Sequence, residues 1–313
     1  MRKPKLFLAL GGGAARGLAH LGVLRVFEAE KITIDGIAGT SMGSMVGAMY
    51  AADPRIEKVI RQALQYMASP EFVNARVHFL RRNTSNDEEE ATLFETLANY
   101  IRRGRVLQKS LTNISFLEKE DLDEVISIFL EDRDISSFIL PLAVVATDLK
   151  SGNTVELRSG PVRSAVAASS AIPGAFPPIE REEGALVDGG LTQMVPVPAC
   201  RKMGADFVVA VNVTHELSAS ESLKRSLEMY FRAHQITQQA LIRQQLNEAD
   251  IVLTPKVGHI HWADFRDPEK IIAAGEEVAK MAVQEIKRRL SRFSRTPAFM
   301  WNRLRRPMSE IIA

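Results

Sequence analysis

The chain has 313 residues, of which 46% are hydrophobic and 25% charged, as in an ordinary soluble globular protein with one large α/β domain or two small ones. Its net charge of +2 gives no global case for nucleic-acid binding. The single cysteine, Cys200, excludes an internal disulfide framework, fits a reducing compartment, and is expected to be a small buried residue.

Apolar strands alternate with periodic helices along the chain. The first apolar run, Leu6–Leu10, is too short for the core of a signal peptide and is expected to be a core strand. No run reaches the ~18 apolar residues of a membrane-spanning helix. The alternation indicates an α/β fold, a three-layer α/β/α sandwich with a mostly parallel central sheet. Strands are expected at Leu6–Leu10, Ile34–Ala38, Ile139–Thr147, Thr154–Leu157, Ala185–Val187, Phe207–Val213 and Ile251–Thr254, and helices at Arg16–Glu30, Met42–Ala51, Arg55–Met67, Leu122–Leu130, Ser222–Asn247 and Pro268–Leu290.

A glycine-rich segment, Gly11–Gly17, follows the first strand and precedes the first helix. Backbone N–H groups in such a loop converge on one point, which suits a phosphate or the oxyanion of an acyl-transfer intermediate. A dinucleotide site is an alternative, because Asp35 lies at a suitable distance to bind a ribose. The G-x-G-x-x-G spacing fails, however, since Arg16 occupies the sixth position from Gly11.

Ser41 lies at the centre of the sequence Gly-Thr-Ser-Met-Gly, Gly39–Gly43. This G-x-S-x-G pattern comes directly after a short apolar strand and opens an apolar stretch at helical spacing. The order strand, sharp turn, helix is that of the nucleophile elbow of serine hydrolases, in which the flanking glycines, Gly39 and Gly43, let the backbone turn tightly. Ser41 is therefore a candidate nucleophile of an esterase or lipase.

Asp188 ends another short strand and is followed by Gly189 and Gly190. Alone this is an Asp-Gly turn, but beside a serine elbow the carboxylate becomes a candidate base. His259 or His261 offers an alternative, a Ser–Asp–His triad in which the histidine comes last in the chain. No H-E-x-x-H pattern and no cysteine pair is present, so we expect neither a metal nor another cofactor.

These motifs together resemble the patatin-like phospholipases, in particular the bacterial type related to neuropathy target esterase. The resemblance covers most of the chain before residue 280, and its motifs occur in the expected order: Gly11–Gly17, Gly39–Gly43, Ala146–Leu149, Ala168–Gly174 and Asp188–Leu191.

The resemblance implies a Ser–Asp dyad, with Ser41 as nucleophile and Asp188 as base, and an oxyanion hole. The hole would be formed by amides around Gly12, Gly13 and Ala14. Gly11, Arg16 and Gly17 would support the loop, with Arg16 either bracing it or meeting a substrate phosphate, and Gly189 and Gly190 would form the turn after the base.

Two positions depart from the family pattern. Ala14 stands where a glycine is usual, and a methyl group there would cost about 1 kcal/mol if its φ is positive. Gln193-Met194 stand in the neighbourhood of the usual Asn–Pro. Neither departure touches the dyad.

The predicted function is that of a serine lipid acyl hydrolase acting on a phospholipid or lysophospholipid. Two alternatives stay open: a lipid acyltransferase with the same dyad, and a catalytically weak lipid-binding protein owing to Ala14. The expected location is the cytoplasm, with attachment to a membrane surface as an alternative, and nucleic acid is not expected as a partner.

The hydrolase domain is expected to cover residues 1–290. Within it, 68–120 is a candidate cap or lipid-facing insertion, with Leu93, Phe94, Leu97 and Ile101 at helical spacing; a helix packed on the core is the simpler interpretation. The basic, aromatic tail, 291–313, suits an anionic bilayer surface. Docking on its own domain, or on a partner subunit in a homo-oligomer, is an equal alternative.

Overall fold

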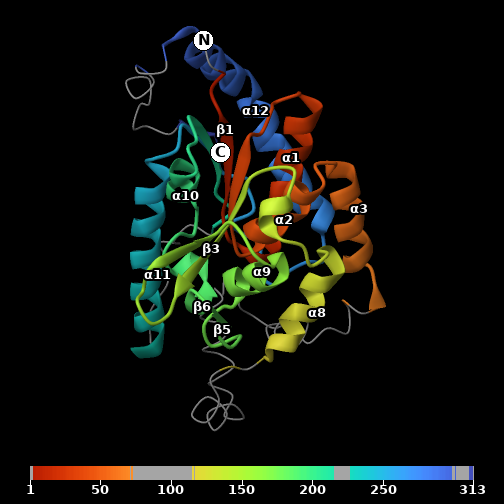
Figure 1. Ribbon diagram of the computed structural model, residues 1–313, viewed down its shortest axis with the longest axis vertical. Helices are drawn as coiled ribbons and strands as arrows, with labels where there is room; N and C mark the ends of the chain where they lie inside the picture. Colours follow the sequence, from red (N-terminus) through yellow and green to blue (C-terminus); the bar gives the residue numbers. More distant parts are fainter. Residues whose placement is uncertain are drawn as a thin grey trace.

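A computed structural model describes residues 3–70, 72, 115, 117–214, 226–297, 300 and 310–312, and every structural statement below refers to these. They form a nine-stranded sheet in the order β5-β6-β3-β2-β1-β7-β8-β9, with β4 pairing to β3 off this path (Figure 1). The strands are β1 Leu6–Leu10, β2 Gly36–Thr40, β3 Leu142–Asp148, β4 Thr154–Leu157, β5 Ile179–Arg181, β6 Gly184–Asp188, β7 Phe207–Val211, β8 Ile251–Leu253 and β9 Glu310–Ile312.

The sheet is mixed but mostly parallel, as the sequence predicts. Strands β3, β2, β1, β7, β8 and β9 pair in parallel, whereas β4 and β6 are antiparallel to β3, and β5 is antiparallel to β6. The strand that leads to Ser41 begins and ends two residues later than expected, because its two glycines, Gly36 and Gly39, weaken the apolar pattern. Strands β5 and β9 have three residues each and were not expected.

Most helices lie where the 3.6-residue period places them, with three differences. The expected helix Arg16–Glu30 begins as a 3₁₀ turn at Ala14 and becomes α-helical at Ala19. Two helices, α9 and α10, were not expected. Alanine supplies much of the buried surface of α9, and α10 has only six residues, so a search for periodic large apolar residues misses both. The helices are η1 Ala14–Leu18, α1 Ala19–Ala29, α2 Met42–Ala52, α3 Ile56–Met67, α8 Lys119–Phe129, η2 Ile135–Ser137, α9 Val162–Ser170, η3 Gly189–Leu191, α10 Val197–Lys202, α11 Ser226–Leu246 and α12 Pro268–Arg295.

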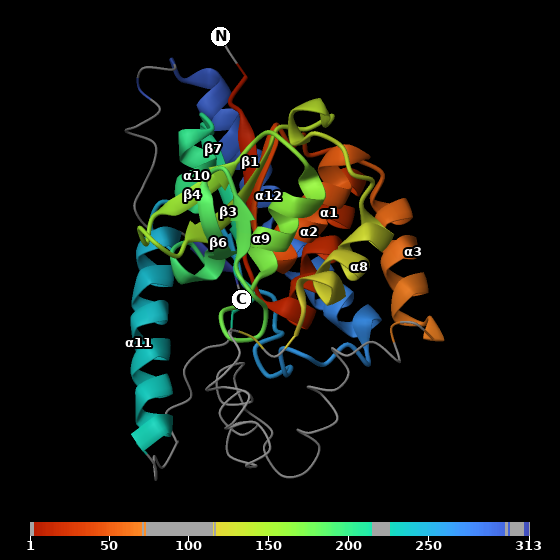
Figure 2. The same ribbon diagram turned by 60° about the horizontal axis from the view of Figure 1, so that its bottom comes forward.

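Helices cover both faces of the sheet, which confirms the three-layer prediction. Successive side chains of a strand point to opposite faces, so Leu6, Leu8 and Leu10 of β1 enter one core while Phe7 and Ala9 enter the other. The first core packs against α1, α2, α3, α9 and α12, and the second against α10 and α11. Figures 1 and 2 show α10 and α11 on one side of the sheet and α1, α2, α3 and α9 on the other.

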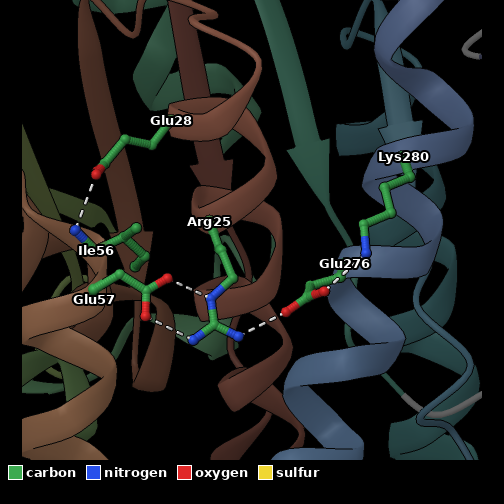
Figure 3. A network of polar contacts seen from close by, with 6 residues as sticks. All are labelled: Arg25, Glu28, Ile56, Glu57, Glu276 and Lys280. Carbon is green, nitrogen blue, oxygen red and sulfur yellow. Dashed lines mark hydrogen bonds and ion pairs between the residues drawn. The ribbon is translucent and has the colours of Figure 1, made fainter.

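Three helices of the larger layer are joined by charged side chains (Figure 3). Arg25 of α1 binds Glu57 of α3 at 2.7 Å and Glu276 of α12 at 2.8 Å. Glu28 accepts the backbone N–H of Ile56 at 3.1 Å and so satisfies a free donor at the start of α3. These groups are partly exposed, so they fix the relative orientation of the helices more than they contribute to stability.

Several expectations fall wholly or partly outside the described residues. The polar run 81–90, the helix containing Leu93 and Ile101, and the aromatic residues Phe299 and Trp301 all lie there. Helix α12 continues without a break from 268 to 295, across the expected boundary at 290, and Phe293 is buried against Phe207.

Residues 310–312 pair with β8, so this end of the tail docks on the sheet of its own domain. Among the helices that the structure describes, none has the length and apolar character needed to cross a bilayer.

Candidate active site

The glycine-rich loop, Ser41 and Asp188 meet at the carboxyl ends of β1 and β2. In an open α/β sheet, ligands bind at this edge, to residues that follow the carboxyl ends of the strands. The register of the sheet explains how Asp188 arrives there. Thr40 pairs with Val145 of β3, and the next residue of β3, Ala146, pairs with Asp188. Asp188 therefore lies level with Ser41 although it reaches this edge on a strand that runs in the opposite direction.

Ser41 has the strained backbone expected of a nucleophile elbow, with φ 51° and ψ −123°. A positive φ is uncommon for a residue other than glycine and persists only where the surroundings fix it. The Ser41 carbonyl accepts the Ser44 N–H at 2.8 Å and the Ser44 hydroxyl at 2.7 Å. A Cβ atom on Gly43 would overlap the Leu10 carbonyl, so this glycine allows α2 to approach β1 directly behind the elbow.

The Ser41 side chain lies close enough to the Asp188 carboxylate to favour its ionised form. The N–H of Gly190 donates to Asp188 Oδ1 at 2.7 Å, and a Cβ on Gly189 would overlap the Val145 carbonyl, so both glycines keep the turn tight. Burial raises the pKa of Asp188 to about 6, although the Gly190 N–H and the Ser41 side chain act against the rise. The result is a carboxylate that is ionised at neutral pH and more basic than one in water.

The glycine-rich loop offers two free amides, not three. The N–H groups of Gly13 and Ala14 donate to no described residue, whereas the Gly12 N–H donates to the Met194 carbonyl at 2.9 Å. Gly12 thus corrects the sequence interpretation, because its amide already has a partner. The Gly11 N–H is likewise bound, at 3.1 Å, to the carbonyl of Val211. The site can hold an oxyanion through Gly13 and Ala14.

Ala14 adopts φ 47°, the left-handed conformation that its glycine-rich setting suggested. The preceding Gly13 has φ 172°, which is extended backbone. A left-handed alanine costs roughly 1–2 kcal/mol relative to its usual conformation. The loop therefore retains its shape with a methyl group at residue 14, and the left-handed conformation lowers the free energy of unfolding.

Arg16, near the end of the loop, is a cation with few polar contacts among the described residues. Its Nε donates to the Gly13 carbonyl at 3.5 Å, the long limit for a hydrogen bond, and no carboxylate pairs with it in the described part of the chain. Burial lowers the pKa of Arg16 to about 10, so it stays a cation. Its charge also helps burial to lower the pKa of His261. Gly17 keeps this turn against Met42, whose side chain a Cβ would overlap.

The rival sites are not assembled. Across the described residues, no histidine hydrogen-bonds Ser41 or Asp188, and His261 Nδ1 accepts the N–H of Ala263 at 3.2 Å instead. The Asp35 carboxylate accepts the Leu6 N–H at 2.8 Å, at the opposite end of β1 from the glycines, so the dinucleotide interpretation is wrong. No group of His, Cys, Asp and Glu suited to a metal occurs in the described ranges.

Two contacts at the site were not anticipated from the sequence. The Ser169 hydroxyl accepts the Ser41 N–H at 2.9 Å, and the Ala171 carbonyl accepts the Asp188 N–H at 2.9 Å. Both residues belong to Ala168–Gly174, where the sequence offered a signal only as part of a family motif.

The Gln193-Met194 departure also finds its explanation. The Gln193 carbonyl accepts the Thr40 hydroxyl at 2.7 Å, and the Met194 carbonyl accepts the Gly12 amide. The backbone makes these contacts, so they do not depend on the side chains that differ from the family pattern.

The comparison with protein families decides the identity. A model described as patatin-like phospholipase matches residues 8–201, which contain all the motifs above. The chain belongs to the patatin-like phospholipase family. The mixed sheet with helices on both sides is the fold of this family.

Relatives of the chain carry names of the same family. An uncharacterised NTE family protein of Mycobacterium tuberculosis is 31% identical over 210 residues, which are 67% of this chain and 49% of that protein. Lysophospholipase nte1 of Aspergillus fumigatus is 29% identical over 66% of this chain and 12% of its own length. The mouse patatin-like phospholipase domain-containing protein 6 is 27% identical over 66% of this chain and 13% of its own. The chain thus spans half or less of these relatives.

A solved structure with a related arrangement is VipD from Legionella pneumophila. It is 14% identical, with a TM-score of 0.47, over 91% of this chain and 67% of VipD.

Proposed function

We propose that this chain hydrolyses an acyl ester of a phospholipid or lysophospholipid through a Ser41–Asp188 dyad. The observation that carries the proposal is the position of the Ser41 side chain beside a buried carboxylate whose pKa is raised to about 6. A serine needs a base beside it to become a nucleophile at neutral pH, and a carboxylate serves better as its pKa approaches the working pH.

The reaction follows from these contacts. Ser41 Oγ attacks the ester carbonyl carbon while its proton passes to Asp188. The tetrahedral intermediate then releases the alcohol, which takes the proton back from Asp188 and leaves an acyl group on Ser41. Water attacks the acyl-enzyme in the same way, giving the free fatty acid and restoring the dyad.

The oxyanion of each tetrahedral intermediate is assigned to the amides of Gly13 and Ala14. Neither of these two N–H groups donates a hydrogen bond to a described residue. Donors that are already in place stabilise negative charge without a rearrangement of the protein. The positive end of the helix that follows favours the same charge.

A phosphate on the substrate would meet Arg16. Arg16 is a mostly buried cation with no carboxylate partner among the described residues, and burial of such a cation is costly unless an anion binds to it. The weak 3.5 Å contact to Gly13 makes bracing of the loop a minor role, so the balance favours a phosphate-bearing ester over a neutral one.

Water is the acceptor that we assign, rather than a second alcohol. Among the relatives named above, the fungal protein is called a lysophospholipase, and no described feature favours an acyltransferase. The lipid-binding alternative assumed that Ala14 distorts the loop and prevents catalysis. The N–H groups of Gly13 and Ala14 have no partner among the described residues, however, so they remain available to an oxyanion.

The test combines active-site labelling with substrate comparison. A fluorophosphonate should modify Ser41, as shown by peptide mapping, and Ser41→Ala should lose both label and lipid hydrolysis while keeping its thermal melt. Label on Ser44, Ser169 or Ser170 would contradict the assignment.

Arg16 is tested separately with two substrates. Arg16→Gln should raise KM for a lysophospholipid severalfold and leave a neutral short-chain ester nearly unchanged, with Arg16→Lys as the charge-preserving control. Equal losses on both substrates would return Arg16 to loop support.

A further inference from the structure

We propose that Ser169 is a positioning residue for the reaction, which holds the backbone of Ser41 in its attacking conformation from the end of α9. The inference rests on the proposed function. The Ser169 hydroxyl is hydrogen-bonded to the Ser41 N–H and the Val145 carbonyl and not to the Asp188 carboxylate, so we assign its effect to the placement of Ser41.

The hydroxyl of Ser169 makes two hydrogen bonds, one as donor and one as acceptor. It is fully buried and donates its only hydrogen to the Val145 carbonyl at 2.6 Å. Its lone pairs are then left to accept, and the Ser41 N–H donates to them at 2.9 Å. A single hydroxyl therefore ties the elbow to β3, the strand that separates β2 from the Asp188 strand β6.

Among the described residues, the Ser41 amide makes one hydrogen bond, to the Ser169 hydroxyl. Strand β2 ends at Thr40, so Ser41 lies past the ladder that binds β2 to its neighbours, and α2 begins one residue later. The first N–H groups of a helix have no partner within the helix. Removal of the Ser169 hydroxyl would leave this partly buried donor without its partner, which favours a different backbone at the elbow. Ser41 already has a positive φ, so a lower-energy conformation is available to it.

The same short segment also holds the base. Two residues after Ser169, the Ala171 carbonyl accepts the Asp188 N–H at 2.9 Å. The end of α9 thus binds the backbone of both reacting residues, Ser41 through a side chain and Asp188 through a carbonyl. Their separation is fixed by one rigid turn rather than by two independent loops, and catalysis is sensitive to such placement, since misplacement by about 1 Å can cost about 10²-fold in rate.

Ser170 provides a matched control within the same turn. It is the next residue of α9, it is half-buried, and its hydroxyl makes no hydrogen bond to a described residue. A serine-to-alanine change there alters helix α9 in the same way but leaves Ser41 untouched.

The experiment measures hydrolysis of a lysophospholipid and the rate at which a fluorophosphonate labels Ser41, for Ser169→Ala and Ser170→Ala. We expect Ser169→Ala to lose roughly tenfold to 10²-fold in kcat and in labelling rate with KM nearly unchanged. Ser170→Ala should stay within about twofold of the unmodified chain. Thermal melts establish that both variants are folded, and Ser169→Cys, which keeps a weak donor and acceptor of similar size, takes the place of an alanine variant that does not fold.

Three results would overturn the inference: labelling within twofold of the unmodified chain in Ser169→Ala, a loss confined to KM, or an equal loss in Ser170→Ala. The variant Ser41→Ala separates this inference from the function on which it rests. If Ser41→Ala is inactive while Ser169→Ala is normal, only the positioning role fails. If Ser41→Ala retains lipid hydrolysis, the dyad itself fails.

Discussion

The elbow Gly39–Gly43 and the glycine-rich loop Gly11–Gly17 share a strained backbone but differ in whether their backbone N–H groups have hydrogen-bond partners. Each holds one non-glycine residue at positive φ, 51° at Ser41 and 47° at Ala14. In the elbow, both the N–H and the carbonyl of Ser41 have partners. In the loop, the N–H groups of Gly13 and Ala14 have none among the described residues.

The difference shows which atoms each segment contributes. In the elbow, the backbone hydrogen bonds of Ser41 fix the orientation of its side chain. Activity should therefore be lost when Ser41 or a residue that holds it is changed. Two amides of the loop have no partner among the described residues, and we propose that they bind the oxyanion, so its side chains should matter less to chemistry than to stability. The following predictions test that contrast, from the largest expected effect to the smallest.

Asp188→Asn should separate chemistry from folding at the elbow. The amide keeps the shape and can still accept from Gly190, but it cannot take the Ser41 proton. We expect kcat to fall about 10²–10⁴-fold, the usual contribution of a general base, with KM little changed. Steady-state kinetics on a lysophospholipid measures this. Near-normal activity in this variant, with an inactive His261→Ala, would restore the histidine triad.

The pH dependence should follow the raised pKa of Asp188. Activity needs the ionised carboxylate, so kcat/KM should fall about tenfold per pH unit below pH 6. Stability should change in the other direction. The folded state binds a proton near pH 6 and the unfolded chain near 3.8, so this group favours the fold at pH 4 and that advantage is lost as the pH rises to 6.

The stability part is measured as a difference between the unmodified chain and Asp188→Asn. The asparagine variant should be the more stable at pH 8, by up to about 3 kcal/mol, and the gap should close near pH 4. The comparison is needed because burial lowers the pKa of His20 to about 4, which removes stability as the pH falls from 6.5. A gap that stays constant with pH would contradict the raised pKa.

Gly43→Ala should damage the elbow by packing. The new methyl group would overlap the Leu10 carbonyl, and β1 must move because backbone cannot turn aside. We expect a loss of about 1–3 kcal/mol in unfolding free energy, with reduced activity. Gly47→Ala on the same helix is the control, because a Cβ there meets the Ile37 side chain at 3.0 Å and gains helix propensity. Chemical denaturation of both variants decides whether the position or the residue type matters.

Ala14→Gly should have the smallest effect and act on the loop. Glycine removes the cost of the positive φ, so the fold should gain up to about 1 kcal/mol, with activity near that of the unmodified chain. Ala15→Gly, at a fully buried neighbour without positive φ, should lose stability instead. A destabilised Ala14→Gly would show that the methyl group packs favourably and that the loop is not strained.

The extent of sequence prediction differs between these two segments. The elbow was predictable because strand, turn and helix are continuous in sequence and the G-x-S-x-G pattern marks the turn. The loop was predicted in position but not in detail: nothing local shows that the Gly12 amide is bound by a carbonyl from residue 194, which lies 182 positions away. Ser169 was missed for the same reason, since its partner Ser41 lies 128 positions away.

By itself the sequence determined the order of most strands and helices, the sharp turn at Ser41 and the family. These follow from apolar periodicity and from glycine, which act over a few neighbouring residues. Only the tertiary structure decided that Asp188 lies level with Ser41 on an antiparallel strand, that the end of α9 holds both, and which loop amides stay free. Such contacts depend on sheet register, and register is settled when distant strands bury their side chains together.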